Sequence, residues 1–173
     1  MKLTAFTTAS LFFLTASAST GSLFSQIALG RTPVTNKGLE VPGENDLYFC
    51  EKPDSYILNI ESVNLVPNPP TAGSTLQISA VGVLSDVITK GAYVDVVVKY
   101  GLITLIKQTM DLCEQVDKVD MECPIKDGKV IIHKSVDLPA VIPPGKYSVS
   151  ANAMTEDDRT ITCLTSTIVF TGK

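Results

Sequence analysis

Apolar and polar residues alternate with a period of two along most of the chain after residue 55, and Pro, Gly and Asn interrupt the alternation. This pattern is typical of strands that bury one face. It predicts about seven strands, of which six can be delimited: 56–65, 75–84, 92–105, 129–138, 146–155 and 160–171. Gly101 is expected to mark a bulge or bend within the third of them. Residues 110–119 could add a turn or two of helix.

Short strands separated by turn signals predict an all-β fold, an antiparallel sandwich or barrel. Residues 139–145, PAVIPPG, are expected to form a stiff apolar crossing between two strands, and residues 156–159, EDDR, a hairpin turn. The pattern shows no internal repeat, and the length of the chain after residue 37 fits a single domain.

Many of the positions that should face the interior carry small side chains, and the chain has no Trp. Small residues opposite Val and Ile could leave an apolar gap between two sheets, which would suit a lipid. The alternative is a well-packed core of modest residues. The small inward candidates are Ala80, Gly82, Ala92, Ala140, Ala151 and Ala153.

The first residues have the order of a secretory signal peptide: Lys2, an apolar stretch, and Ala16-Ser17-Ala18 as a small-x-small cleavage pattern. We expect a signal peptide over residues 1–18, a pro-segment or disordered tail over 19–37, and the folded domain over 38–173. The apolar stretch is shorter than the roughly 20 residues that a membrane anchor needs. Residues 38–173 hold 11 Lys and Arg against 18 Asp and Glu. This acidic balance argues against nucleic-acid binding.

Four cysteines in a secreted domain predict two disulfides, for which three pairings exist. Cys113 and Cys123 flank a short polar loop and would most simply pair with each other, leaving Cys50 to pair with Cys163. Chain-entropy arguments give about 3 kcal/mol for the short ring and nearly 5 kcal/mol for the long one.

Candidate catalytic and metal-binding groups are sparse. The one histidine, His133, falls on the solvent face of its strand by parity, and the chain has no Gly-x-Ser-x-Gly elbow. One histidine and four oxidised cysteines cannot form a zinc site. The carboxylate pairs Asp111/Glu114 and Asp117/Asp120 and the run 156–158 are better read as solvated surface. We therefore predict no enzymatic activity, no cofactor and no metal.

The spacing Cys-x9-Cys followed by Pro-Ile-Lys-Asp-Gly (113–128) resembles the ML (lipid-recognition) domain family, which includes the sterol carrier of Niemann–Pick type C disease. The order of the other landmarks agrees: Cys50, a proline cluster after Leu65, Leu138-Pro139, and a lone cysteine in the last strand. The stretch 38–43, GLEVPG, is more similar to fungal members that transfer phosphatidylglycerol and phosphatidylinositol. The resemblance covers residues 38–172.

The resemblance implies an immunoglobulin-like, two-sheet antiparallel β-sandwich that holds a lipid in an apolar cavity between its sheets. It implies the disulfides Cys50–Cys163 and Cys113–Cys123, and we expect the second to border the cavity mouth beside residues 102–106. The sterol carriers have a third disulfide where this chain reads PNPP (67–70), and an aromatic, proline-rich segment where it reads LITLI (102–106). These departures favour a phospholipid over a sterol.

Under this reading the chain is a monomeric lipid carrier of the secretory pathway, in a vacuole- or lysosome-like lumen or outside the cell, with transient membrane contact. Tyr100 or Tyr147 could place a hydroxyl near the headgroup, and Lys99, Lys107 or Lys146 could meet its phosphate. The expected cavity-lining residues are Val94, Val96, Val98, Tyr100, Leu102, Ile106, Val136, Leu138, Ile142, Tyr147 and Val149.

Three alternatives remain open at this stage. The first is a sterol carrier of the same family. The second is a secreted interaction module with a solid core, which predicts no extractable ligand. The third is a hydrolase on a sandwich scaffold, which would need His133 or a carboxylate pair inside a cleft.

Overall fold

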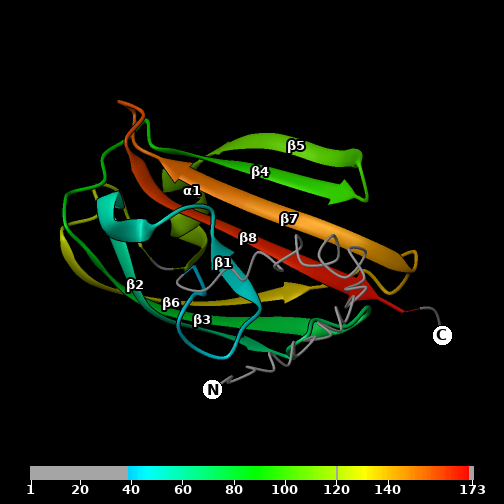
Figure 1. Cartoon of the computed structure of the whole chain (residues 1–173). Helices are drawn as coiled ribbons and strands as arrows, with labels where there is room; N and C mark the ends of the chain where they lie inside the picture. Colours follow the sequence, from blue (N-terminus) through cyan, green and yellow to red (C-terminus); the bar gives the residue numbers. More distant parts are fainter. Residues whose placement is uncertain (1–38, 120, 172–173) are drawn as a thin grey trace, which may run out of the picture. The chain divides into compact units, whose positions relative to one another are not determined.

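Two antiparallel sheets form the domain in the computed structural model, which describes residues 39–119 and 121–171 (Figure 1). One sheet has the strand order β1-β8-β7-β4-β5 and the other β2-β3-β6. The two-sheet sandwich predicted from the sequence is therefore confirmed. The strands are β1 (Leu47–Phe49), β2 (Leu58–Val66), β3 (Thr75–Leu84), β4 (Tyr93–Tyr100), β5 (Ile103–Asp111), β6 (Gly128–Asp137), β7 (Gly145–Met154) and β8 (Thr160–Phe170).

Helical structure is limited to short pieces among the described residues: the 3-10 turn η2 (Pro53–Ser55), the helix α1 (Leu112–Val116) and the 3-10 turn η3 (Asp117–Val119). The carboxylate of Asp111 caps α1 by accepting a hydrogen bond from the Glu114 amide at 3.1 Å. No described helix has the length and apolar character that crossing a bilayer requires. The expected signal peptide and pro-segment lie outside the described residues.

The prediction of one strand over residues 92–105 is wrong. The chain reverses at Gly101 and Leu102, so β4 and β5 form a hairpin, with Gly101 at a φ of +57°. Tyr100 pairs with Ile103, but Val98 pairs with Ile106, because one extra residue in β5 shifts the register. This shift returns even-numbered residues of β5 to the inner face, so the alternation appears to continue unbroken through the turn.

Both predicted disulfides are present, Cys50–Cys163 and Cys113–Cys123. Cys50 follows β1 and Cys163 lies in β8, where the Cys50 amide also donates to the Cys163 carbonyl at 3.1 Å. The long ring therefore fastens the start of the domain to its last strand. The three-residue β1 escaped the sequence analysis because it is too short to show alternation.

Two apolar clusters fill parts of the interior. One joins the two sheets at the end where β4 begins and contains Ile57, Leu84, Ile88, Ala92, Ala153 and Ile161. The other lies beneath β1 and contains Val41, Phe49, Tyr56, Ile60 and Val63. We call the end of the sandwich that holds the first cluster the closed end. Ala92 and Ala153, two of the small residues expected to face inward, thus belong to the packed core.

Candidate functional site

A cavity of about 490 Å³ lies between the two sheets, beyond the core cluster of the closed end. Strands β2, β3 and β6 provide one wall, and β7 and β8 the other. This volume lies within the range of small-molecule sites. The apolar side chains of its walls include Leu58, Ile60, Val63, Leu65, Leu76, Ile78, Val130, Ile132, Val149, Leu164 and Ile168.

Small residues make room for this cavity where alternation places them on the inner faces. Ala80 and Gly82 on β3 and Ala151 on β7 all line it. A Cβ on Gly82 would lie 2.8 Å from the Asn59 carbonyl oxygen and 2.9 Å from Leu58 Cδ1, so the backbone of β2 approaches too closely for a side chain. The predicted gap between the sheets is confirmed. Ala140 instead lies exposed on the crossing.

The cavity opens at the end of the sandwich opposite the closed end. Its exposed lining residues are Asp46, Asn68, Pro69, Thr167 and Val169. Strand β1 pairs with β8 only as far as Ser166, so among the described residues no strand pairs with the last part of β8 on that side, and this part forms one rim of the opening. The loop between β2 and β3 forms the other rim. Leu58 and Val130 both line the cavity and pack against the closed-end cluster, which serves as its floor.

Polar side chains in the cavity lining are few, and two of them form hydrogen bonds within the protein. The Ser166 hydroxyl donates to the Asp46 carbonyl at 2.9 Å, and the Thr165 hydroxyl donates to the Val149 carbonyl at 3.1 Å. The Thr162 hydroxyl is buried and has no hydrogen-bond partner among the described residues. Asp46, at the rim, is the one carboxylate among the described residues of the lining. Such walls can hold an aliphatic ligand but offer no nucleophile paired with a base.

Candidate catalytic and metal groups lie elsewhere. His133 is exposed on the outer face of β6, where its Nδ1 lies 3.1 Å from the Ser79 hydroxyl. In the part of the chain that the structure describes, no three His, Cys, Asp or Glu side chains are placed to hold a metal ion.

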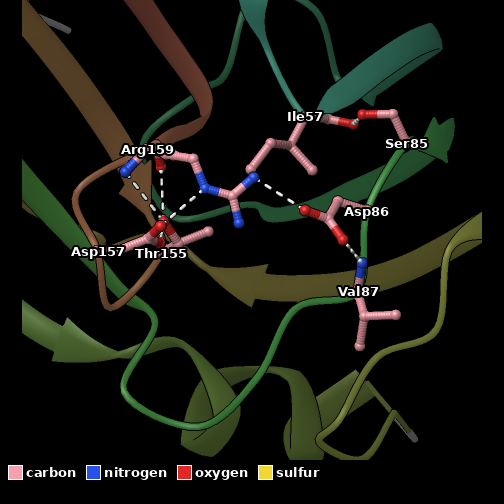
Figure 2. A network of polar contacts seen from close by, with 7 residues as sticks. All are labelled: Ile57, Ser85, Asp86, Val87, Thr155, Asp157 and Arg159. Atoms are coloured by element: carbon pink, nitrogen blue, oxygen red, sulfur yellow. Dashed lines mark hydrogen bonds and ion pairs between the residues drawn. The ribbon is translucent and has the colours of Figure 1, made fainter.

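The ionisable groups with clear pKa shifts also lie outside the cavity. At the closed end, Arg159 bridges the two sheets (Figure 2), with Nη1 2.8 Å from Asp86 Oδ2 and Nε 3.0 Å from Asp157 Oδ2. The hydrogen bond from Arg159 lowers the pKa of Asp86. Hydrogen bonds from Thr155 and then Arg159 lower the pKa of Asp157. Burial raises the pKa of Tyr56, and the hydrogen bond to Asp158 raises that of Tyr93.

Of the expected lining residues, Val149 lines the cavity. Val96 and Val98 lie on the same inner face and pair in register with Ala151 and Val149, but they are on β4, one strand away from the cavity wall that β7 provides. Val94 packs against the floor cluster, and Tyr147 is buried opposite Ile168.

The remaining expected residues lie toward the surface. Leu102 does not face inward, as expected, because it sits in the β4–β5 turn and is 99% exposed. Tyr100, Ile106 and Val136 are also exposed, and Leu138 and Ile142 are half-buried on the connection between β6 and β7. None of Lys99, Lys107 and Lys146 lines the cavity; all three are exposed.

The sequence analysis missed most of the walls from β2, β3 and β8, although it delimited these strands. Their alternation already separates Leu76, Ile78 and Ala80 from Gln77 and Ser79. In β8 the signal is weaker, because Thr162 and Ser166 are polar residues on the inner face.

The Cys113–Cys123 ring does not border the cavity mouth, which corrects the expectation. The hairpin returns the chain along β5 to the closed end, where Leu112 donates to the Ala92 carbonyl at 2.9 Å. Cys113 Sγ lies 3.8 Å from the Thr89 carbonyl, and none of the described residues between 112 and 123 lines the cavity. The ring therefore pins the α1 segment over the closed end.

Fold and cavity together define a class: two-sheet antiparallel β-sandwiches with an apolar chamber between the sheets. The ML domain family matches this chain over residues 44–170, and the chain belongs to that family. Its two disulfides and this membership are typical of a secreted or lumenal protein.

Relatives of known name are similar over most of the chain. A phosphatidylglycerol/phosphatidylinositol transfer protein of Aspergillus fumigatus is 52% identical over 151 residues, which cover 87% of this chain and 85% of the relative. A protein of the same name from Emericella nidulans is 46% identical over 166 residues, covering 95% and 96%. Among solved structures, a Niemann–Pick type C2 protein from the Japanese carpenter ant superposes with a TM-score of 0.55 at 12% identity. That match covers 72% of this chain and 98% of the ant protein and shows the shared fold.

Proposed function

We propose that this protein carries a phospholipid between membranes, with the acyl part of the lipid enclosed between the two sheets and no bond made or broken. The observation that carries the proposal is the apolar cavity of about 490 Å³ within the sandwich. A solid-core interaction module would have filled this space with side chains. The names of relatives with about half of their residues identical support phosphatidylglycerol and phosphatidylinositol as the cargo.

Binding would draw on the hydrophobic effect. Each methylene that moves from water into the cavity contributes about 0.8 kcal/mol. Within a bilayer the same methylene is already out of water, so exchange between bilayer and cavity is nearly balanced for the acyl chains. A carrier needs this balance, because it must release the lipid as well as take it up.

The headgroup would stay at the opening. Asn68 and Thr167 supply hydrogen-bonding groups there, and Asp46 can accept hydrogen bonds from glycerol or inositol hydroxyls. Lys146 is the register partner of Val169 on the rim and brings a positive charge near the opening for the lipid phosphate. A sterol carrier of the same family is the second candidate, and it would occupy the same walls.

The remaining parts of the proposal concern the protein's route and contacts. Residues 1–18 would direct the chain into the secretory pathway, 19–37 would be a pro-segment, and 38–173 would act as a monomer in a vacuole-like lumen or outside the cell. Its membrane contacts would last only as long as lipid exchange.

The first experiment is native mass spectrometry of the purified protein, followed by organic extraction and lipid identification. One phospholipid per chain is the expected result. Protein that stays empty after incubation with phosphatidylglycerol, phosphatidylinositol and sterol vesicles would overturn the proposal. A stoichiometric sterol would assign the chamber to the second candidate.

A cavity-filling variant tests the location of the cargo. Ala151→Phe places a ring in the chamber, whereas Ser135→Phe adds the same ring on the exposed outer face of β6. We expect Ala151→Phe to reduce bound lipid by about tenfold or more, equivalent to ~1.4 kcal/mol. Ser135→Phe should leave lipid occupancy unchanged. Equal occupancy in both variants would place the lipid elsewhere.

A further inference from the structure

Exposed apolar side chains gather at the end of the sandwich where the cavity opens. At this end β2, β4, β6 and β8 finish and β3, β5 and β7 begin (Figure 1). Most of the large apolar residues that are exposed in the described chain lie here. We call this set the apolar end: Val66, Tyr100, Leu102, Ile103, Val136, Val141 and Val169.

The two most exposed members project from separate segments. Leu102, 99% exposed, occupies the β4–β5 turn, and Val141, 87% exposed, lies on the crossing between β6 and β7. Backbone hydrogen bonds hold both segments, from the Gly101 amide to the Lys146 carbonyl at 3.1 Å and from the Leu138 amide to the Ser74 carbonyl at 2.9 Å. A fixed frame that presents apolar residues from several strands to solvent marks an interaction surface.

Charge is distributed unevenly between the two ends. Lys99 and Lys146 lie beside the β4–β5 turn, and Asp137, the carboxylate at the end of β6, accepts a hydrogen bond from the Thr75 hydroxyl at 2.7 Å. Glu44 and Asp46 lie across the opening, beside β1. The closed end carries the hairpin turn 156–158 and the acidic residues Asp111, Glu114, Asp117 and Glu122. A negatively charged surface would therefore attract the β4–β5 side and repel the closed end.

We propose that the apolar end docks on an anionic lipid bilayer, with Leu102 and Ile103 entering the interface, Val141 beside them, and Lys99 and Lys146 facing lipid phosphates. This deepens the proposed function, because it brings the opening of the cavity to the membrane and turns the acidic closed end toward water. Apolar side chains beside lysines are the combination that binds an anionic bilayer surface.

Charge favours a bilayer over a second copy of the chain. A two-fold contact through this surface would place Lys99 and Lys146 of both copies in one interface. It would also join two domains that each carry 11 basic against 18 acidic residues over 38–173. An anionic bilayer instead offers phosphates to the lysines and hydrocarbon to Leu102.

The absence of Trp from the chain allows a direct test. Leu102→Trp places a single reporter in the β4–β5 turn, and Val87→Trp places the same reporter near the closed end, where Val87 is 37% exposed. With vesicles of phosphatidylglycerol and brominated phosphatidylcholine, we expect a blue shift and quenching for Leu102→Trp and neither for Val87→Trp. Equal quenching of both reporters, or of neither, would overturn the proposal.

Co-sedimentation with vesicles measures how much the apolar residues and the lysines each contribute to membrane binding. Leu102→Ser/Ile103→Ser should weaken binding to phosphatidylglycerol vesicles by tenfold or more, whereas Ile131→Ser, an exposed apolar residue on the outer face of β6, should not. Lys99→Gln/Lys146→Gln should remove most of the dependence on salt and on anionic lipid. A Leu102→Ser/Ile103→Ser variant that binds like the parent would overturn the proposal.

Lipid content separates this proposal from the proposed function. The Leu102→Ser/Ile103→Ser protein, loaded by detergent exchange, should hold as much extractable lipid as the parent, because neither residue lines the cavity. Normal docking by a protein that never holds lipid would refute the carrier and keep the docking surface. A dimer that forms without vesicles and is abolished by Leu102→Ser would assign the surface to a second copy and overturn docking.

Discussion

Tyr100 and Tyr147 are register partners on β4 and β7, and their hydroxyls donate to adjacent carbonyls of one proline pair. Tyr147 donates to Pro143 at 2.9 Å and Tyr100 donates to Pro144 at 3.1 Å. Their ring centroids lie 5.1 Å apart, and the ring of Phe170 packs edge-on against Tyr147 at 5.5 Å. The two tyrosines therefore fasten the apolar crossing to the sheet beside the cavity opening, and their hydroxyls are already engaged in the absence of a headgroup.

The buried member of this pair should matter more for stability. Tyr147 is 8% exposed and Tyr100 is 38% exposed. We expect Tyr147→Phe to lower the free energy of unfolding by about 1 kcal/mol, because it removes the partner of a half-enclosed carbonyl. Tyr100→Phe should change the free energy of unfolding by less than about 0.5 kcal/mol, because the exposed Pro144 carbonyl can accept a hydrogen bond from water instead. Urea unfolding followed by circular dichroism measures both, and an equal loss would contradict the ranking.

Gly145 opens β7 at a φ of +150°, directly against the Tyr100 ring. A Cβ at this position would overlap the ring and lie 2.8 Å from its hydroxyl oxygen. Gly101 has a φ of +57° and no heavy atom within 4 Å of its Cβ position, so a side chain there meets left-handed backbone strain but no neighbouring atom. We expect Gly145→Ala to cost more unfolding free energy than the roughly 1–2 kcal/mol of a left-handed alanine at Gly101.

A double-mutant cycle identifies the cause of that difference. In a Tyr100→Ala background the overlap is gone, so Gly145→Ala should cost at least 0.5 kcal/mol less than in the parent, within the usual range for contacting residues. Strictly additive costs would show that backbone conformation, and not the tyrosine ring, excludes a side chain at position 145.

Alternation along the sequence was sufficient to predict an antiparallel sandwich or barrel, because side-chain direction in a strand follows residue parity. It left an apolar gap and a well-packed core both open, and the resemblance to the ML domain family favoured the two-sheet sandwich with a cavity. Alternation failed at the β4–β5 hairpin for a physical reason. The extra residue in β5 offsets the parity change that the two-residue turn introduces, so Ile106 again shares a face with Val98. Gly101 is therefore the one sign of a reversal along this stretch of the sequence.

The position of the cavity depends on which strands lie opposite each other, and local pattern does not contain this information. The side chains of Val96 and Val149 both face inward, but only Val149 lies on a strand that forms a cavity wall. Strand order is set by long-range pairing, such as β1 with β8 and β4 with β7. A single sequence therefore predicts well which side chains face inward, but predicts poorly which strands lie next to each other.

The ion pairs of Arg159 with Asp86 and Asp157 should make the stability of the folded protein depend on pH in the acid range. The pKa values of Asp86 and Asp157 are lowered from 3.8 in the folded protein. Their contribution to stability is therefore complete above pH 3.8 and is lost as the pH falls below that value through the folded pKa. We expect Asp86→Asn/Asp157→Asn to flatten the fall of unfolding free energy between about pH 4 and pH 2.

The matched control is Asp127→Asn, which removes an exposed carboxyl outside the network. Its pH profile should follow the parent. Parallel profiles for all three proteins, measured by urea unfolding at constant ionic strength, would show that the Arg159 network does not contribute to the acid dependence.

The two disulfides should differ in how much they contribute to the free energy of unfolding. Cys50 and Cys163 are 113 residues apart, and Cys113 and Cys123 are 10 apart. Cys50→Ala/Cys163→Ala should cost nearly 5 kcal/mol of unfolding free energy, and Cys113→Ser/Cys123→Ser about 3 kcal/mol. Because the short ring lies far from the opening, its removal should leave lipid occupancy intact at temperatures where the variant is folded. A loss of bound lipid from that folded variant would contradict this assignment.

The chamber between the sheets also has a mechanical consequence. Hydrostatic pressure favours states of smaller volume, and the volume decrease on unfolding scales with the internal voids that unfolding eliminates. A sandwich that keeps about 490 Å³ open should therefore be unusually compressible and should unfold at lower pressure when empty than when filled. For this protein, cargo would act as part of the solid interior, so that the loaded and unloaded forms differ in density as well as in content.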